Sequence, residues 1–191
     1  DLDTPQAVVF DLDPGAPAAI EECCQIALLI RDLLAAVGLV AYPKTSGSKG
    51  LQLYLPLNTP CTHQRAADFA LAVGQVLERQ HRELVTTTMA RAVRPGKIFV
   101  DWSQNARFKT TIGVYSLRAR PEPTCSTPVR WDEVEACAAR GVVLRFEWRD
   151  VPGYVIAQVL GGLVAGLALW GIARGKDGFD PTGNMAANGY A

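Results

Sequence analysis

The chain has 191 residues, 49% of them hydrophobic, and its 19 Lys and Arg residues balance 19 Asp and Glu residues. This length allows one domain with its own core, or one domain and an appendage, and the zero net charge at first argues against a nucleic-acid partner. Two histidines supply too little for a zinc site or a histidine-dependent triad, and five cysteines without metal-ligand spacing indicate a reduced, cytoplasmic compartment.

The first apolar run ends in two acids. Ala7 to Phe10 predicts a strand, and Asp11 and Asp13 follow it with one residue between them. Alternate residues of a strand project to the same side, so this spacing aims both carboxylates at one point. A third acid, Asp101, closes a second apolar run at 97–100. Three such carboxylates suit two-metal phosphoryl chemistry, although a turn or a helix cap would also explain the first pair.

Helices and strands alternate after the first strand. Apolar residues recur at helical spacing from Ile20 to Val37, and Gly38 is a plausible left-handed stop. A strand over 39–42, a turn over 45–50 and a returning strand over 51–55 follow.

Thr62 is placed to cap a second helix, whose inner face comprises Ala66, Phe69, Ala70, Val73, Val76 and Leu77. With the apolar run before Asp101, this order predicts an α+β fold in which helices pack on one side of a mixed sheet.

The turn Ser46-Gly47-Ser48-Lys49-Gly50 carries donors that suit phosphate. Backbone N–H groups, hydroxyls and an ammonium all bind phosphate oxygens. The turn is not a Walker A loop, because the glycine spacing differs and a strand should follow. A plain hairpin loop also fits these residues.

Positive charge is concentrated in one stretch. Between Arg79 and Arg120 lie nine Arg and Lys residues against only Glu83 and Asp101. A basic stretch around a metal-binding acid suits a polyanionic substrate, but an ordinary solvated surface would also explain these charges.

Several long motifs occur in a specific order: VFDLDPG at 9–15, TSGSKGLQLYLPL at 45–57, GKIFVDWSQN at 96–105, KTT at 109–111 and YSLRAR at 115–120. Together, over about residues 8–150, they resemble the polymerase domain of bacterial DNA ligase D, a member of the archaeo-eukaryotic primase superfamily. The resemblance implies a catalytic core of the RNA-recognition-motif type.

The resemblance also implies an activity. It implies a nucleotidyltransferase that extends broken DNA ends with NTPs or dNTPs during non-homologous end joining, in the nucleoid, with the end-binding protein Ku. Two Mn²⁺ or Mg²⁺ ions would be held by Asp11, Asp13 and Asp101. The implied nucleotide-binding residues are Ser46, Gly47, Ser48, Lys49, Gln52 and Arg118, and the implied nucleic-acid-binding residues are Arg107 and Lys109.

Two departures from the pattern of this family favour an alternative function. The position of Gln52 is usually a histidine in this family, and glutamine cannot carry a proton's charge. Only residues 1–7 precede the first strand, where the family has a longer segment, so we expect an N-terminally truncated domain. The alternative function is therefore an inactive fragment that binds only nucleotide or nucleic acid.

The tail has a different character. Residues 151–173 contain no charged residue in twenty-three positions, enough for a membrane span, expected over 154–173. Gly162 and Gly166 have the spacing of closely packed membrane helices.

Residues 153–191 resemble a transmembrane helix and loop of bacterial Z-type aquaporins, without the pore motifs, so we expect no water-channel activity. The predicted division is a polymerase domain over 1–151 and an aquaporin-like segment over 152–191. This division is explained either by a fusion or assembly artefact, or by a genuine membrane-tethered protein.

Overall fold

The computed structural model describes residues 3–119, 121, 123–147 and 151–174. The chain divides into two compact units, Asp1–Trp148 and Arg149–Ala191. The elements of the first unit are, in order, β1 (Ala7–Pro14), α1 (Ile20–Ala35), β2 (Tyr42–Thr45), β3 (Leu51–Pro56), α2 (His63–Gln80), β4 (Val85–Thr86), η1 (Arg91–Val93), β5 (Ile98–Asp101), η2 (Trp102–Asn105) and α3 (Trp131–Arg140).

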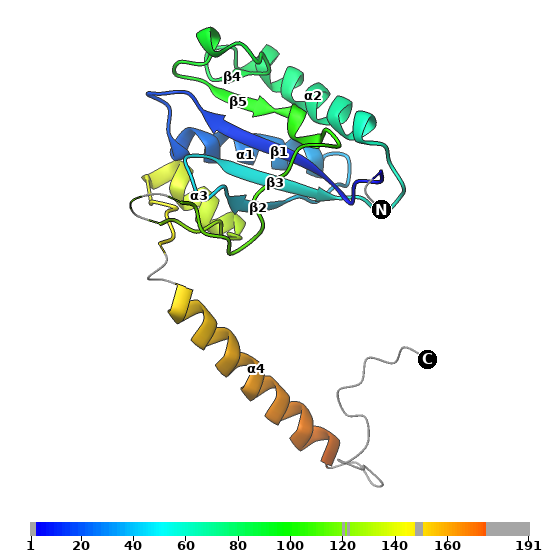
Figure 1. Ribbon diagram of the computed structural model, residues 1–191, viewed down its shortest axis with the longest axis vertical. Coiled ribbons are helices and arrows are strands. Elements are labelled where there is room, and N and C mark those ends of the chain that lie inside the picture. Colours follow the sequence, from blue (N-terminus) through cyan, green and yellow to red (C-terminus); the bar gives the residue numbers. More distant parts are fainter. Residues whose placement is uncertain (1–2, 120, 122, 148–150, 175–191) are drawn as a thin grey trace. The chain divides into compact units, whose positions relative to one another are not determined.

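The five strands form one mixed sheet in the order β2-β3-β1-β5-β4, with β1 at its centre (Figure 1). The pairs β1–β3, β1–β5 and β2–β3 are antiparallel, and β4–β5 is parallel. The predicted α+β class with a mixed sheet is therefore confirmed.

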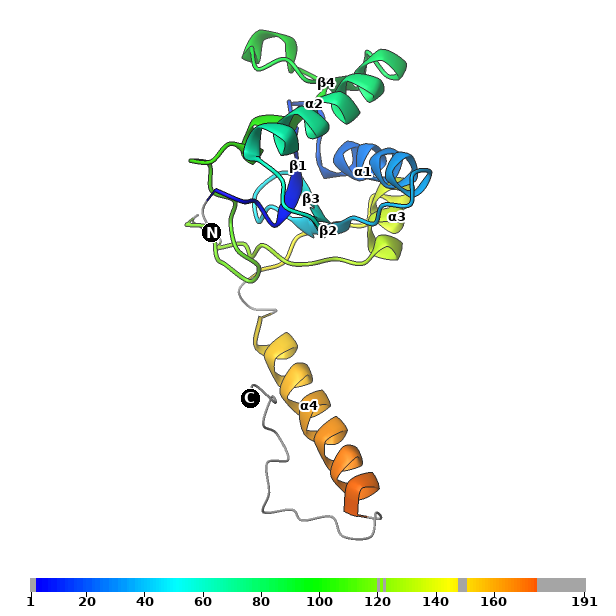
Figure 2. The same cartoon turned by 90° about the vertical axis from the view of Figure 1, so that its right-hand side faces the viewer.

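Alternation along β1 separates the core from the opposite face. Phe10 and Leu12 are fully buried in the hydrophobic core. Phe10 packs edge-on against Phe69 of α2, with ring centroids 6.3 Å apart, and the Cys23 thiol of α1 contacts the Leu12 carbonyl at 3.5 Å. Asp11 and Asp13 have the opposite parity, so they face away from these helices. Figure 2 shows α3 beside α1.

The helix predictions are confirmed with small differences. The Thr62 hydroxyl accepts the Arg65 N–H at 3.2 Å, so Thr62 caps α2 as expected. The strand expected over 39–42 begins instead at Tyr42, because the Leu39 N–H bonds the Leu34 carbonyl at 2.9 Å and continues the turn that ends α1. Val37, expected on the inner face, is 68% exposed beyond that end. Strand β4 and helix α3 were not predicted.

The second unit contains one described helix, α4 (Val151–Arg174). Apolar side chains occupy all its sides, and those of Val164 and Leu167 are each 67% exposed. Within the described residues, no helix has both the length and the apolar character needed to cross a membrane. The membrane span expected over 154–173 is therefore not found, and the loop expected after it lies outside the described residues.

Candidate functional site

Four polar side chains form one row across four neighbouring strands. The strand register places Lys44 opposite Gln52, Gln52 opposite Asp11, and Asp11 opposite Asp101. Directly opposed residues of antiparallel strands point to the same face. Asp13, two residues after Asp11, shares that face. The sheet thus brings the three predicted acids together on the side away from α1 and α2.

Burial and mutual repulsion disfavour negative charge on two of these acids. Asp11 is 6% exposed, and burial, followed by the charge of Asp13, raises its pKa to about 6. The Gln52 amide opposes this shift by donating to Asp11 Oδ1 at 3.2 Å. The pKa of Asp13 is also raised, by partial desolvation and then by Asp101, against the positive charges of Arg94 and Arg118.

Asp101 is fixed by the turn that follows it. Its Oδ1 accepts the Ser103 N–H at 3.0 Å and the Ser103 hydroxyl at 2.5 Å. Asn105, in the same turn, exchanges two 2.8 Å hydrogen bonds with the backbone of Val9 on β1. Ser103 and Asn105 therefore support the site, and only their place directly after Asp101 in the motif could have indicated this role.

The donor chemistry of the acids fits a divalent cation. Carboxylate oxygens are the ligands that Mg²⁺ and Mn²⁺ prefer, and a bound cation would offset both causes that raise the pKa values of Asp11 and Asp13, which are burial first and then repulsion from the neighbouring acid. In the described part of the chain, however, no three His, Cys, Asp or Glu side chains are already gathered as a metal site. The residues fit such an ion chemically without forming a finished coordination shell.

A cavity of about 420 Å³ lies beside two of the acids, and it is lined by Asp11, Asp13, Ser46, Ser48, Gln52, Arg118 and Ala119, with Asp101 not among its lining residues. Arg118 is held there because its Nε donates to the Ser46 carbonyl at 3.1 Å. The Ser46 hydroxyl accepts the N–H groups of Ser48 and Gly50, at 3.2 and 3.1 Å. Ser46 therefore also orders the loop that follows it.

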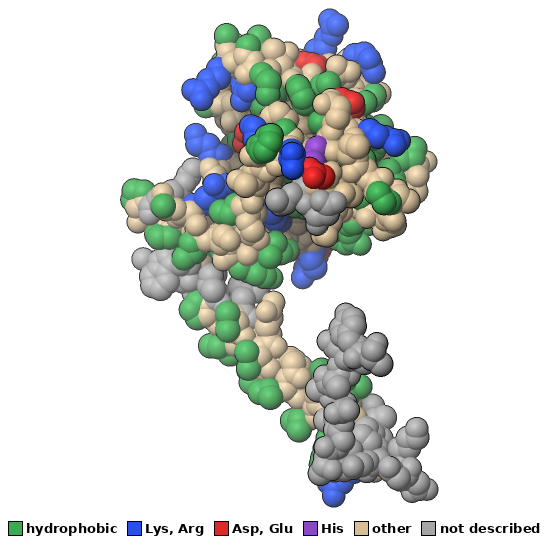
Figure 3. Space-filling model, turned by 45° about the vertical axis from the view of Figure 1, so that its right-hand side comes forward, with side chains coloured by type: hydrophobic (Ala, Val, Ile, Leu, Met, Phe, Trp, Pro, Cys, Tyr) green, Lys and Arg blue, Asp and Glu red, His purple; other side chains and the backbone are tan. Residues whose placement is uncertain are grey.

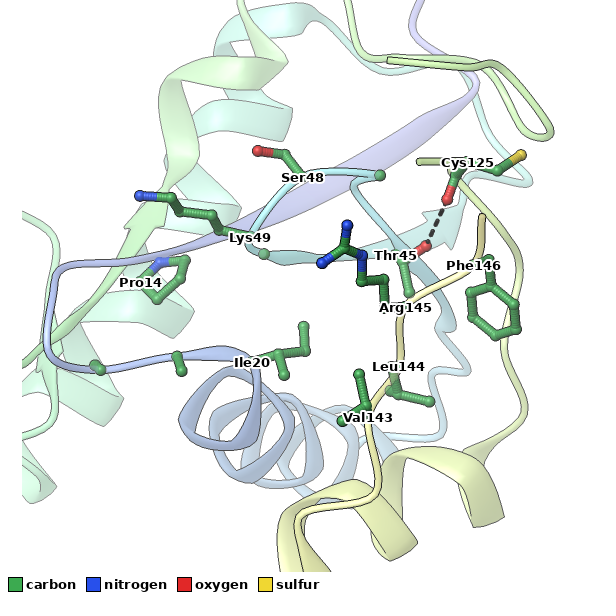
Figure 4. Close-up of a pocket in the computed structure, with 14 residues that line it drawn as sticks. Pro14, Ile20, Thr45, Ser48, Lys49, Cys125, Val143, Leu144, Arg145 and Phe146 are labelled. Atoms are coloured by element: carbon green, nitrogen blue, oxygen red, sulfur yellow. Dashed lines mark hydrogen bonds between the residues drawn. The ribbon is translucent and has the colours of Figure 1, made fainter. Parts of the chain in front are cut away.

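The predicted phosphate loop is shared between two cavities. Gly47 and Lys49 line a second cavity of about 360 Å³, and Ser48 lines both. In Figure 4, Lys49 and Arg145 lie around this second cavity, together with apolar Ile20 and Leu144. Lys49 is thus not among the residues that line the cavity of the acids.

The predicted nucleic-acid contacts lie on the segment after η2. Arg107 and Lys109 are exposed, and Arg107 pairs with Asp3 at 2.8 Å. Between them, Phe108 is 89% exposed, and the Arg107 guanidinium lies 5.5 Å from its ring centroid. Figure 3 shows more Lys and Arg than Asp and Glu side chains on the face in view. Arg120, at the end of the basic stretch, lies outside the described residues.

Curated relatives share much of this sequence. Residues 1–156 match the primase-polymerase domain family of LigD. The multifunctional non-homologous end joining protein LigD of Mycobacterium bovis is 50% identical over 133 residues, which cover 70% of this chain and 18% of that protein. The LigD protein of Pseudomonas aeruginosa is 36% identical over 135 residues, covering 71% of this chain and 16% of that protein.

A solved structure agrees with the fold. The polymerase domain of Mycobacterium tuberculosis ligase D in complex with DNA aligns with a TM-score of 0.73 and 43% identity, covering 80% of this chain and 52% of that one. The chain spans about a sixth of the length of the curated relatives named above. The family match over most of the chain and the shared fold agree, and the chain belongs to the LigD primase-polymerase domain family.

Proposed function

We propose that this chain is a polymerase-type nucleotidyltransferase that adds nucleotides to the 3'-hydroxyl of a DNA end during non-homologous end joining. The observation that carries the proposal is the row in which Asp11 and Asp101 lie opposite each other, beside a cavity lined by Ser46 and Arg118. Family membership and the DNA-bound solved relative support the same reaction class.

Asp11, Asp13 and Asp101 are the residues that would hold two divalent ions, Mn²⁺ or Mg²⁺. When bound, such ions neutralise phosphate charge and lower the cost of forming the attacking oxygen. The protein itself supplies position: Ser103 orients Asp101, and Gln52 orients Asp11. Gln52 donates a hydrogen bond but takes up no proton, so its role here is orientation.

The nucleoside triphosphate is assigned to the cavity beside the acids. Arg118 and the hydroxyls of Ser46 and Ser48 are donors on its wall, and donors of these kinds bind phosphate oxygens. Gly47 shapes the loop, and Lys49 adds positive charge on the loop's other side. The triphosphate would lie next to Asp11 and Asp13, which line the same cavity.

The DNA strand is assigned to the exposed segment after η2. Arg107 and Lys109 would contact phosphates, and Phe108 has the exposure that stacking on an unpaired base requires. We further propose action in the nucleoid with Ku, and a domain boundary near residue 151. The DNA surface is tested by Phe108→Ala, which should weaken binding to a single-stranded overhang more than to a blunt duplex.

Primer extension tests the reaction. The full chain is given a primed DNA end, ribonucleotides and Mn²⁺, beside Asp101→Ala and a surface control, Asp32→Ala, whose acid pairs with Arg31 on α1. We expect Asp101→Ala to lose extension by about a hundredfold or more, as removal of a charge-stabilising group does. Unchanged extension in Asp101→Ala refutes the assignment of the acids.

A second candidate function is binding without catalysis. The neutral Gln52 beside Asp11 favours it, because no proton-carrying group stands at that position. Calorimetric titration of the folded chain with ATP and with primed DNA separates the two functions. Binding without extension under any divalent ion supports the binding role, and extension excludes it.

A further inference from the structure

Lys44 is a buried cation that none of the assignments above uses. It lies on β2 at one end of the cross-strand row and is 4% exposed. Its Nζ donates to the Ile112 carbonyl at 2.9 Å and to the Ser126 hydroxyl at 2.8 Å. Both acceptors are neutral, and the described residues place no carboxylate at ion-pair distance. A buried charge with only neutral partners costs stability, and an apolar residue of similar size would avoid that cost.

The ammonium joins the two ends of one segment. Ile112 and Ser126 lie at the two ends of a stretch called here the Arg118 segment, whose described residues are 112–119, 121 and 123–126. Within it, the Tyr115 N–H donates to the Ser126 carbonyl at 2.6 Å, and the Ser126 N–H donates to the Ser116 carbonyl at 3.0 Å. Lys44 therefore links the two ends of the Arg118 segment, through the Ile112 carbonyl and the Ser126 hydroxyl.

The same contacts anchor the segment to the sheet. The Ser126 hydroxyl donates to the Thr45 carbonyl at 2.8 Å, next to Lys44 in β2. Further along, the Thr124 hydroxyl donates to the Gly47 carbonyl at 2.5 Å, and Arg118 Nε donates to the Ser46 carbonyl at 3.1 Å. The position of Arg118 on the cavity wall thus depends on a segment whose base is fixed by Lys44.

Lys44 itself does not line the cavity of the acids. Its influence on a ligand there must pass through the Arg118 segment or through its charge. The Tyr54 ring, 5.4 Å from Nζ, covers part of the ammonium and limits its contact with solvent. A mechanical route through Ile112 and Ser126 is the one that direct contacts support.

We propose that Lys44 is a positioning residue of the nucleotide site, which closes the Arg118 segment and sets Arg118 beside the Ser46–Gly50 loop. The identity of the ligand, a nucleoside triphosphate, rests on the proposed function. Removal of the ammonium should loosen the segment and weaken the hold of Arg118 on the triphosphate, while the acids that carry out the chemistry keep their places on β1 and β5.

The test compares Lys44→Met, which keeps the length and removes the charge, with wild type. Arg31→Met is the matched control, because it removes an exposed cation of α1 that pairs with Asp32 and Glu135, away from the cavity. We expect Lys44→Met to raise KM for ATP about tenfold and to change kcat by less than about threefold, since charge-assisted hydrogen bonds are lost at a distance from the reacting atoms. In an Arg118→Ala background, Lys44→Met should raise KM little further.

Amide hydrogen exchange gives a readout without catalysis. Exchange in 112–119 should accelerate in Lys44→Met and stay at the wild-type level in Arg31→Met. Ser126→Ala, which keeps the lysine but removes one of its acceptors and the hydrogen bond to the Thr45 carbonyl, should also accelerate exchange there.

Each outcome decides one proposal. If Lys44→Met leaves amide exchange in the Arg118 segment unchanged, the assignment of Lys44 is overturned. The same holds if wild type is active and Lys44→Met leaves KM for ATP unchanged. If wild type neither extends DNA nor binds ATP, the proposed function fails, and the exchange data still decide whether Lys44 closes the segment.

Discussion

Asp11 lies on the central strand between Gln52 and Asp101, and its surroundings oppose its charge. Its folded-state pKa of about 6 stands above the ordinary value of 3.8. The folded protein therefore holds a proton that the unfolded chain has released between about pH 4 and pH 6. Stability falls as pH rises through this window, and ionised Asp11 destabilises the metal-free fold at pH 7.

We expect Asp11→Asn to be inactive and yet more stable than wild type. The gain in unfolding free energy at pH 7 should be about 2 kcal/mol, and most of it should disappear at pH 4, where Asp11 is protonated in the folded protein and close to half protonated in the unfolded chain. Urea denaturation without divalent ions, at both pH values, measures the difference. A variant that is less stable than wild type at pH 7 would contradict this account of Asp11.

At the scale of elements, the Ser46–Gly50 loop contains Gly47, which packs closely against the backbone of the Arg118 segment. Gly47 has a φ of +64°, and a Cβ there would lie 2.9 Å from the Ser126 backbone nitrogen. Gly38, at the end of α1, has a φ of +74° with nothing within 4 Å of its Cβ position. A residue with a Cβ would be strained at both positions, but only at position 47 would that Cβ also collide with a neighbouring atom.

Alanine substitutions at positions 38 and 47 separate the cost of backbone strain from the cost of the steric collision at position 47. Gly38→Ala should cost about 1 kcal/mol of unfolding free energy, as expected for a left-handed position. Gly47→Ala should cost about 1–2 kcal/mol more, and it should also raise KM for ATP, because the Arg118 segment must move away from the loop. Equal losses in the two variants, with KM unchanged, would show that the loop tolerates the collision.

The same elements show how far the sequence could predict this structure. Helical spacing and the Thr62 cap predicted α1 and α2, because these signals are local. Strand β4 was missed because it has two residues and no pattern of its own. The two-residue spacing predicted that Asp11 and Asp13 share a face, but the opposition of Lys44 and Gln52 depends on register between separate strands. The support from Ser103 and Asn105 likewise appears only when the chain is folded.

At the scale of the whole molecule, the two units have different surfaces. The unit Asp1–Trp148 has a continuous buried core, whereas α4 exposes apolar side chains along its length. Apolar surface of this extent favours self-association in water. The buried core residues of the first unit all lie within Asp1–Trp148.

We expect a chain ending at residue 151 to keep the urea midpoint of the full chain within about 10% and to remain monomeric at concentrations where the full chain associates. Denaturation and size-exclusion chromatography with light scattering measure the two properties. A large fall in the midpoint would show that α4 contributes to the folded unit.

The cross-strand row also determines how mispaired strands would affect activity. Each of its four members comes from a different strand, so a slip of one residue between any two strands turns one member to the opposite side of the sheet. No partly paired sheet presents Asp11 and Asp101 together with Gln52 and Lys44. A copy in which β1 and β5 are misaligned would separate Asp11 from Asp101 and so lack activity altogether, and the active fraction of a preparation would report the molecules in which these two strands are correctly paired.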